Sequence, residues 1–228
     1  MYRIGMSYYY LFTYNLKNTE RMVLNVSNQA MKKPVLALMA GLPGVGKTTL
    51  ATYLGQILAW NVIDKDTIKD ALLDRIHMPE EEAGRAAFEV AFGLLRDALT
   101  SGRSAILDSS ALHPFIVENV LQLCNELREE PGINIQLKVV LCEVNNEIRL
   151  HRLQTRKQRS SQRRSAIIYT EEHQRFDHLP PDKLVLHTEN SLETYADQAA
   201  NYLTARNTHA FSLSHTPSVT KFFAGSAL

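Results

Sequence analysis

The feature that most constrains this chain is a glycine-rich turn that follows directly on a short apolar run. Residues 32–50 read KKPVLALMAGLPGVGKTTL. The apolar run 35–40 does not alternate with polar residues, which predicts a strand buried on both faces. Leu50, Leu54 and Leu58 then recur at helical spacing. A buried strand, a glycine turn and a helix in this order predict an α/β fold.

The same alternation of short apolar runs and helical patterns continues along the chain. We expect further strands at 61–64, 104–108, 135–144 and 182–188. We also expect a helix capped by Thr67, a helix that begins at Gly84, and helices over 113–129 and 192–203. Strands that alternate with helices form a parallel sheet covered on both faces, with right-handed crossovers. We therefore predict a five-stranded parallel sheet in the order 2-3-1-4-5, with the strand before the glycine turn at its centre.

Composition and length favour one globular domain with two less ordered ends. The chain has 228 residues, of which 45% are hydrophobic and 21% charged. We expect a poorly ordered extension over 1–32, a folded domain over 33–206 and a flexible tail over 207–228. No run of about 18 apolar residues occurs, so we expect no membrane-spanning helix and a cytoplasmic location. The formal net charge of +1 argues against a general affinity for nucleic acid.

The glycine turn matches the P-loop motif G-x-x-x-x-G-K-[ST] through Gly41, Gly46, Lys47 and Thr48. Glycines let successive backbone N–H groups approach phosphate oxygens, and the following helix N-terminus adds partial positive charge. The lysine of this motif bridges the outer phosphates and the threonine hydroxyl binds Mg²⁺. We therefore expect ATP and Mg²⁺ as ligands, with the nucleotide held by nine consecutive residues: Gly41, Leu42, Pro43, Gly44, Val45, Gly46, Lys47, Thr48 and Thr49.

Two further features indicate what happens to the bound phosphates. The sequence holds no N/T-K-x-D motif, which argues against a GTPase. Asp108 ends the expected strand AILD beside the loop, where a carboxylate can support Mg²⁺ together with Thr48. Ser109 follows it, at the place where many ATPases carry a glutamate that activates water. Its absence favours transfer of the phosphoryl group to a hydroxyl over hydrolysis.

Two aspartates leave the second expected strand in the segment IDKDTIK. Asp64 and Asp66 would face the phosphate loop, where a carboxylate can accept the proton of an attacking hydroxyl. We take Asp66 as the candidate base and Asp64 as a candidate contact of the phosphoryl acceptor. The alternative is purely structural, with Asp64 ending the strand and Asp66 capping the next helix.

A basic segment, EIRLHRLQTRKQRSSQRRS, follows the fourth expected strand. Arg149, Arg152, Arg156, Arg159 and Arg163 fall at intervals of three and four residues, which places them on one helical face. This could be an ordinary solvated basic face. Phosphoryl transfer, however, needs cations that neutralise charge on the transferring group, which favours a lid over the site.

These segments resemble P-loop kinases of the AAA-33 type, a group similar to polynucleotide 5′-kinases, zeta toxins, chloramphenicol phosphotransferase and gluconate kinases. The resemblance spans residues 34–203 and rests on GLPGVGKTT, IDKDTIKDAL, GRSAILDSSAL, NEIRLHRLQTR and HQRFDHLPPDKLVLHTENS. It implies a small-kinase fold with a basic lid, with Asp66 as the general base and Arg152 and Arg156 as lid arginines that act with Lys47. It also implies that Lys69 contacts the acceptor, at a position often held by arginine.

The main functional hypothesis is an ATP-dependent kinase that phosphorylates a hydroxyl of a small molecule, acting as a monomer or a homodimer. A nucleic-acid 5′-hydroxyl kinase and a zeta-like nucleotide-sugar kinase are alternatives. Nucleic acid is disfavoured because Ser109 and Ser110 follow Asp108 where polynucleotide kinases look like D-T-N, and because the helix HPFIVENV lacks an arginine near its start. A rival of another class is an ATP-switched binding protein with little catalysis.

Overall fold

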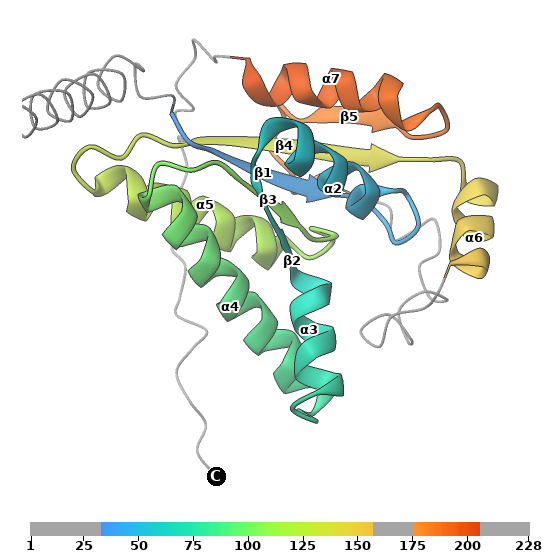
Figure 1. Cartoon of the computed structure of the whole chain (residues 1–228), viewed down its shortest axis with the longest axis horizontal. Helices are drawn as coiled ribbons and strands as arrows, with labels where there is room; N and C mark the ends of the chain where they lie inside the picture. The colour runs from blue at the N-terminus through green and yellow to red at the C-terminus, as the bar shows by residue number, and fades with distance from the viewer. Residues whose placement is uncertain (1–32, 157–175, 206–228) are drawn as a thin grey trace, which may run out of the picture.

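The computed structural model describes residues 33–156 and 176–205. Over these residues short strands alternate with helices, as the apolar pattern predicts (Figure 1). In chain order the elements are β1 (Val35–Ala40), α2 (Lys47–Leu58), β2 (Asn61–Asp64), α3 (Lys65–Asp74), α4 (Glu80–Thr100), β3 (Ala105–Asp108), α5 (Pro114–Glu129), β4 (Gln136–Glu143), α6 (Asn146–Thr155), β5 (Leu184–His187) and α7 (Leu192–Thr204).

The strands form one parallel sheet in the order β2-β3-β1-β4-β5, which confirms the predicted topology. The central strand is β1, which pairs with β3 on one side and β4 on the other. Every residue of β1 is buried. Its unbroken apolar run therefore reflects a strand with helices over both faces, because a strand with one solvated face would alternate.

Two pairs of helices cover the sheet. Helices α2 and α7 pack against each other on one face, and α4 and α5 lie on the other (Figure 1). Helix α4 turns a row of buried residues inward, namely Ala83, Ala87, Ala91 and Leu95. Helix α3 packs along α4, and the two project together away from the sheet (Figure 1). None of the described helices combines the length and apolar character needed to cross a membrane.

Two helices begin earlier than the sequence pattern predicts. Helix α4 begins at Glu80, about one turn before Gly84, and its first turn holds three glutamates that interact favourably with the positive end of the helix dipole. Helix α3 begins at Lys65, so the predicted cap at Thr67 is wrong: Asp64 caps the helix, and Thr67 lies within its first turn. In both cases the first turn of the helix is polar, so apolar periodicity does not indicate where the helix begins.

The basic segment is helical over a shorter range than its arginine spacing predicts. Helix α6 ends at Thr155, and Arg156 already has extended backbone geometry. Arg159 and Arg163, expected on the same helical face, lie outside the described residues. The expected extension 1–32 and tail 207–228 also lie outside them, so the proposed domain limits stay a prediction.

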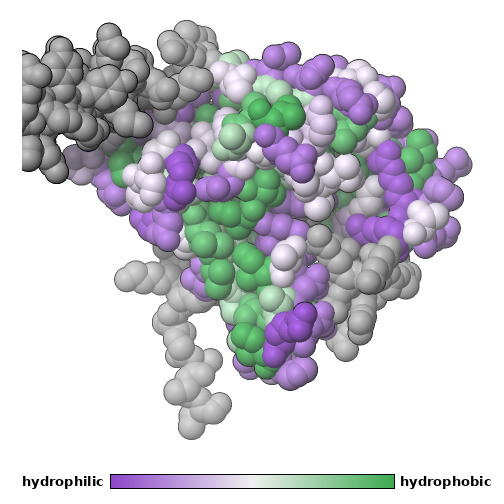
Figure 2. Space-filling model, in the orientation of Figure 1, coloured by the Kyte–Doolittle hydropathy of each residue, from purple (hydrophilic) through white to green (hydrophobic). Residues whose placement is uncertain are grey.

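An apolar band lies on the outer surface over α4 (Figure 2). Val90 and Leu94 belong to this helix and keep 45% and 47% of their surface exposed. They stand two residues away from Phe88 and Phe92 along the helix. At about 100° per residue, Val90 and Phe88 lie on roughly opposite sides of the helix axis.

Candidate functional site

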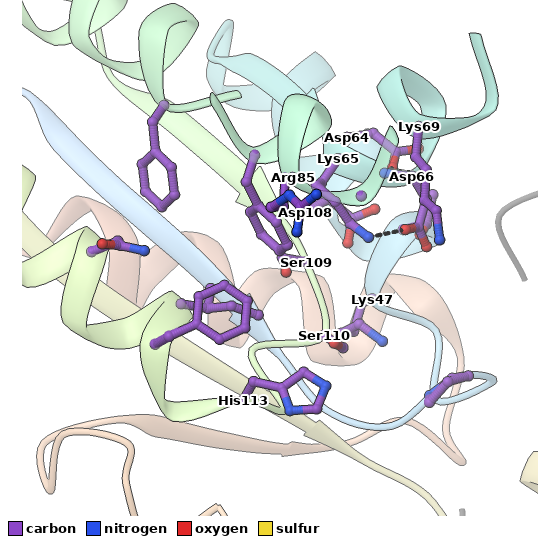
Figure 3. A pocket seen from close by; sticks show the side chains of 18 of the residues that line it. Lys47, Asp64, Lys65, Asp66, Lys69, Arg85, Asp108, Ser109, Ser110 and His113 are labelled. Atoms are coloured by element: carbon purple, nitrogen blue, oxygen red, sulfur yellow. Dashed lines mark hydrogen bonds and ion pairs between the residues drawn. The ribbon is translucent and has the colours of Figure 1, made fainter. Parts of the chain in front are cut away.

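The candidate residues gather at the edge of the sheet where the parallel strands end. Strand β1 leads into the glycine turn, β2 ends at Asp64 and β3 ends at Asp108. Asp64 and Asp108 are register partners in the β2–β3 pairing, so their backbones lie side by side. A cleft of about 1390 Å³ opens at this edge, and Lys47, Asp66 and Asp108 are grouped around it (Figure 3).

The glycine turn is held in a shape that other residues would strain. Gly41 has φ +130°, and a Cβ atom there would lie 2.4 Å from the carbonyl oxygen of Cys142. Gly44 has φ +91°, and its Cβ would lie 3.0 Å from the carbonyl oxygen of Arg149. The Gly41 amide donates to the Ser110 carbonyl at 3.0 Å, which ties the turn to the segment after β3. The motif glycines are therefore required by close backbone approach as well as by dihedral angle.

Lys47 begins helix α2 and reaches back over the turn, where its ammonium donates to the carbonyl oxygen of Leu42 at 3.0 Å. Burial lowers the pKa of Lys47, the carboxylate of Asp108 opposes this shift, and the guanidinium of Arg156 adds to it. The ammonium thus lies in a poorly solvated place between an acidic and a basic group. A cation there interacts strongly with an anionic ligand, because little water screens it.

Asp108 is a buried carboxylate at the end of a buried strand, with only 4% of its surface exposed. Burial raises the pKa of Asp108 to about 6, although the Lys47 ammonium and a hydrogen bond from Thr48 both favour its ionised form. Its Oδ2 atom is buried without a hydrogen-bond partner among the described residues. A buried carboxylate oxygen normally has a partner, so this atom suits a ligand such as a cation.

The residues around Asp108 fit Mg²⁺ when it shares its coordination with phosphates. Within 33–156 and 176–205, no group of three His, Cys, Asp or Glu side chains is arranged to hold a metal ion by itself. Mg²⁺ is commonly bound by one or two protein oxygens together with substrate phosphates and water. Thr48 and Asp108, hydrogen-bonded to each other beside the glycine turn, provide such a pair.

The two aspartates at the junction of β2 and α3 have different roles. Asp64 is the cap of helix α3: its Oδ1 accepts from the amides of Asp66 at 2.9 Å and Thr67 at 3.2 Å. The structural alternative that assigned the cap to Asp66 is therefore wrong, because a cap side chain must precede the amides it accepts from. Asp66 lies in the first turn of α3, pairs with the ammonium of Lys65 at 2.7 Å and lines the cleft.

On the other side of the glycine turn, Arg152 is fixed by a threonine that sequence reasoning did not single out. Arg152 donates to the hydroxyl of Thr188 at 3.1 Å and to its carbonyl oxygen at 2.7 Å. The same hydroxyl donates to the carbonyl oxygen of Val45 in the glycine turn at 2.7 Å. Thr188 is fully buried directly after β5. It therefore links helix α6 to the phosphate loop.

The three described arginines of the basic segment, Arg149, Arg152 and Arg156, are divided between packing and the cleft. Arg149 is buried, donates to Asn146 Oδ1 at 2.8 and 3.0 Å, and approaches the carbonyl oxygen of Pro43 at 3.5 Å. It supports the glycine turn from behind and is not part of a solvated basic face. Arg152 and Arg156 both line the cleft, on the side of the glycine turn.

Beyond Asp108 the cleft continues between α4 and α5. Lys69 lines it and pairs with Glu80 at 3.5 Å. Four ring-bearing residues that sequence reasoning did not select also line this part: Phe88, Phe92, His113 and Phe115. The spacing of Phe88 and Phe92 on one helix was visible in the sequence, but such a pair is ordinarily a core contact. Only the fold brings them opposite Phe115.

Comparison with known proteins agrees with this geometry. A family model described as an AAA domain, AAA_33, matches residues 36–179, and the search of curated proteins found no match. A solved structure of a proposed kinase from Chloroflexus aurantiacus J-10-fl is similar, with a TM-score of 0.56 and 19% identity over 75% of this chain and 99% of that one. An APS kinase from Mycobacterium tuberculosis, solved in complex with AMPPNP and APS, is similar with a TM-score of 0.55 and 16% identity over 76% of this chain and 99% of that one.

At such identities the two structures establish the fold and leave the substrate open. The family match is independent of them and covers more than half of the chain, from within β1 to Leu179. The predicted resemblance to P-loop kinases of this type is thereby confirmed. The chain belongs to the AAA_33 family of AAA domains and has the α/β fold of a P-loop kinase.

Proposed function

We propose that this protein is an ATP-dependent phosphotransferase that moves the γ-phosphoryl group of ATP to a hydroxyl of a small molecule. The proposal rests mainly on one observation: the carboxylate of Asp66 lines the same cleft as Lys47 and Asp108. A protein that only binds nucleotide needs the loop and its lysine, but it has no need of a second carboxylate, besides Asp108, that acts on this lysine and raises its pKa against the effect of burial, as Asp66 does. The kinases among the similar structures add support.

The side chains divide the work of transfer according to where they lie. The amides of the glycine turn and Lys47 hold the phosphates, while Arg152 and Arg156 lie on the same side and neutralise charge on the transferring group. Thr48 and Asp108 would hold Mg²⁺, which supplies further neutralisation of phosphate charge when bound. Ser109 occupies the position beside Asp108 and offers no carboxylate to activate water.

Asp66 acts on the acceptor. Its carboxylate takes the proton of the acceptor hydroxyl as the hydroxyl oxygen forms a bond to the γ-phosphorus of ATP. The bond from that phosphorus to the bridging oxygen breaks, and the products are ADP and a phosphate monoester. Lys65 holds the carboxylate by an ion pair of 2.7 Å, which orients the base from the same turn of α3.

The test of this function is the variant Asp66→Asn, measured as acceptor-dependent release of ADP over a panel of alcohols. Loss of a positioned base lowers the rate on the order of 10²–10⁴-fold. ATP affinity should stay near normal because Lys47 and Thr48 are unchanged. Asp74→Asn is the matched control, because Asp74 is exposed at the far end of the same helix and does not line the cleft.

Two outcomes would contradict the proposal in different ways. If the Asp66→Asn protein turned over within a few-fold of the parent, Asp66 would not be the base. If ATP bound but no alcohol stimulated ADP release, while a partner protein bound more tightly with ATP, the chain would be a nucleotide-switched binding protein. Lys47→Ala should abolish ATP binding under either interpretation.

A further inference from the structure

The cleft is larger than nucleotide binding requires, and the part of it between α4 and α5 is lined by aromatic rings. Pockets that bury one small ligand commonly measure about 300–1,000 Å³. The cleft of about 1390 Å³ therefore has room for a second ligand beside ATP. We call this part between α4 and α5 the ring-lined arm, defined by Phe88, Phe92, His113 and Phe115.

The rings of this arm come from two helices and contact one another. Phe88 of α4 meets Phe115 of α5 edge-on, with ring centroids 5.5 Å apart and planes at 80°. His113 stacks on Phe115, with ring centroids 5.8 Å apart and ring planes at 16°. Phe115 nevertheless keeps 44% of its surface exposed on the wall of the cleft. An exposed phenyl ring beside other rings favours a flat apolar ligand that would cover it.

The charges on the wall of the cleft formed by α3, α4 and α5 are already balanced. Four basic side chains line it, and each is ion-paired: Lys65 with Asp66, Lys69 with Glu80, Arg85 with Glu81, and Arg96 with Glu126. Glu89 also lines the arm, and no ion pair to it is present among the described residues. This wall is therefore neutral or slightly acidic, in contrast to the side of Lys47, Arg152 and Arg156. An anionic acceptor would have to break an existing pair before it gained a cation.

We propose that the phosphoryl acceptor is an uncharged alcohol with an aromatic or heteroaromatic ring, whose ring lies on Phe115 while its hydroxyl reaches Asp66. Sugar acids, sugar phosphates and nucleic acid are poor matches to this arm because they bring negative charge and, for the first two, no aromatic ring. The inference rests on the proposed phosphotransfer, since it concerns the substrate of that reaction. Binding to the arm can nevertheless be measured without turnover.

The first experiment measures binding of three matched probes to the full chain loaded with AMPPNP and Mg²⁺. Phenyl β-D-glucopyranoside carries a ring and no charge, methyl β-D-glucopyranoside lacks the ring, and phenyl β-D-glucuronide adds a carboxylate. Saturation-transfer NMR should show the phenyl protons in contact with the protein, and titration should rank the uncharged phenyl probe tightest. Equal or tighter binding of the methyl or the glucuronide probe would overturn the proposal.

The second experiment uses variants of the arm. Phe115→Leu removes the ring but keeps an apolar side chain, and it should weaken the phenyl probe about 3- to 10-fold. Phe115→Tyr keeps the ring and should restore binding. Val90→Ala is the control on α4, because Val90 is exposed on the other side of that helix and does not line the cleft. Unchanged affinity in Phe115→Leu would overturn the proposal, provided that its melting temperature and ATP affinity match the parent.

Turnover separates this inference from the proposed function. Ring-dependent binding without ADP release from any alcohol would leave the ring-lined arm as a binding site and refute phosphotransfer. Fast ADP release with gluconate, glucose 6-phosphate or an oligonucleotide 5′-hydroxyl, exceeding that with ring-bearing neutral alcohols, would keep the kinase and refute the inferred acceptor. We expect kcat/KM to be at least tenfold higher for the neutral alcohols with an aromatic ring than for gluconate, glucose 6-phosphate or the oligonucleotide.

Discussion

Replacing Asp108 by asparagine should make the ligand-free protein more stable at neutral pH, although it removes a residue expected to support Mg²⁺. The carboxyl is buried, and burial raises its pKa from 3.8 to about 6. A carboxyl whose pKa is raised in the folded state binds its proton more tightly folded than unfolded. Its contribution to stability is therefore fully present below pH 3.8, falls as the pH rises, and is lost above pH 6.

The size of this effect follows from the shift. One pKa unit corresponds to about 1.4 kcal/mol, so a rise of roughly two units removes about 3 kcal/mol of stability between pH 4 and pH 7. Asparagine has the shape of the protonated carboxyl and can still accept the hydrogen bond from Thr48. The variant and the parent should thus unfold at similar urea concentrations near pH 4, and the variant should gain about 3 kcal/mol above pH 6.5.

The assay is urea unfolding of both proteins in EDTA at several pH values from 4 to 8, followed by fluorescence or circular dichroism. A second titration with ATP and Mg²⁺ should show the opposite order, with stabilisation of the parent and little of the variant. If Asp108→Asn were less stable than the parent at pH 7.5 without metal, favourable interactions of the ionised carboxylate would outweigh the cost of burying it. The inference that Asp108 Oδ2 has no stabilising partner in the ligand-free protein would then be wrong.

Two further predictions concern the supports of the glycine turn. Gly41→Ala forces a Cβ to within 2.4 Å of the Cys142 carbonyl oxygen at φ +130°, so it should lose more stability in a melting experiment than Gly102→Ala, which has φ +73° and open space. A loss no larger than that of Gly102→Ala would show that the close approach is not rigid. Thr188→Val removes the hydroxyl that bonds the Val45 carbonyl oxygen and the Arg152 guanidinium. It should lower the free energy of unfolding by about 1–3 kcal/mol and weaken ATP binding. Thr188→Ser keeps the hydroxyl and should change neither. If Thr188→Val bound ATP as tightly as the parent, the position of Arg152 would not matter for nucleotide binding.

The topology was predictable from the sequence because its causes are local. A strand buried on both faces must be apolar throughout, and a helix that covers a sheet must show apolar residues at helical spacing. Val35–Ala40 and the alternation after it carry both signals, and right-handed crossovers then leave few possible orders of strands. The positions of Gly41, Lys47 and Thr48 followed from their motif for the same reason, since the motif is the local structure.

The helix ends and caps were less predictable because the competing residues are chemically alike. Asp64 and Asp66 both stand at a strand–helix junction, and only the backbone decides which one accepts from the amides of the first turn. The arginine spacing after β4 likewise fitted one long helical face. The structure divides it: Arg149 is buried against the glycine turn and Arg152 is engaged by Thr188, which follows another strand.

The ring-lined arm of the cleft depends on contacts that no local sequence pattern contains. Phe88 and Phe115 are 27 residues apart (115 − 88), on helices whose sequences explain how each packs on the sheet but not what faces across the gap. Two of the ion pairs that neutralise this wall, Lys69 with Glu80 and Arg96 with Glu126, join α3 to α4 and α4 to α5, so counting charges along the chain could not reveal those two. If the protein is a phosphotransferase as proposed, we expect the placement of the helices beyond β2 and β3 to set the choice of acceptor, and the phosphate loop to bind only the phosphoryl donor. If the neutral ring-bearing acceptor is right, changes confined to α4 and α5 should alter the acceptor while ATP affinity stays constant.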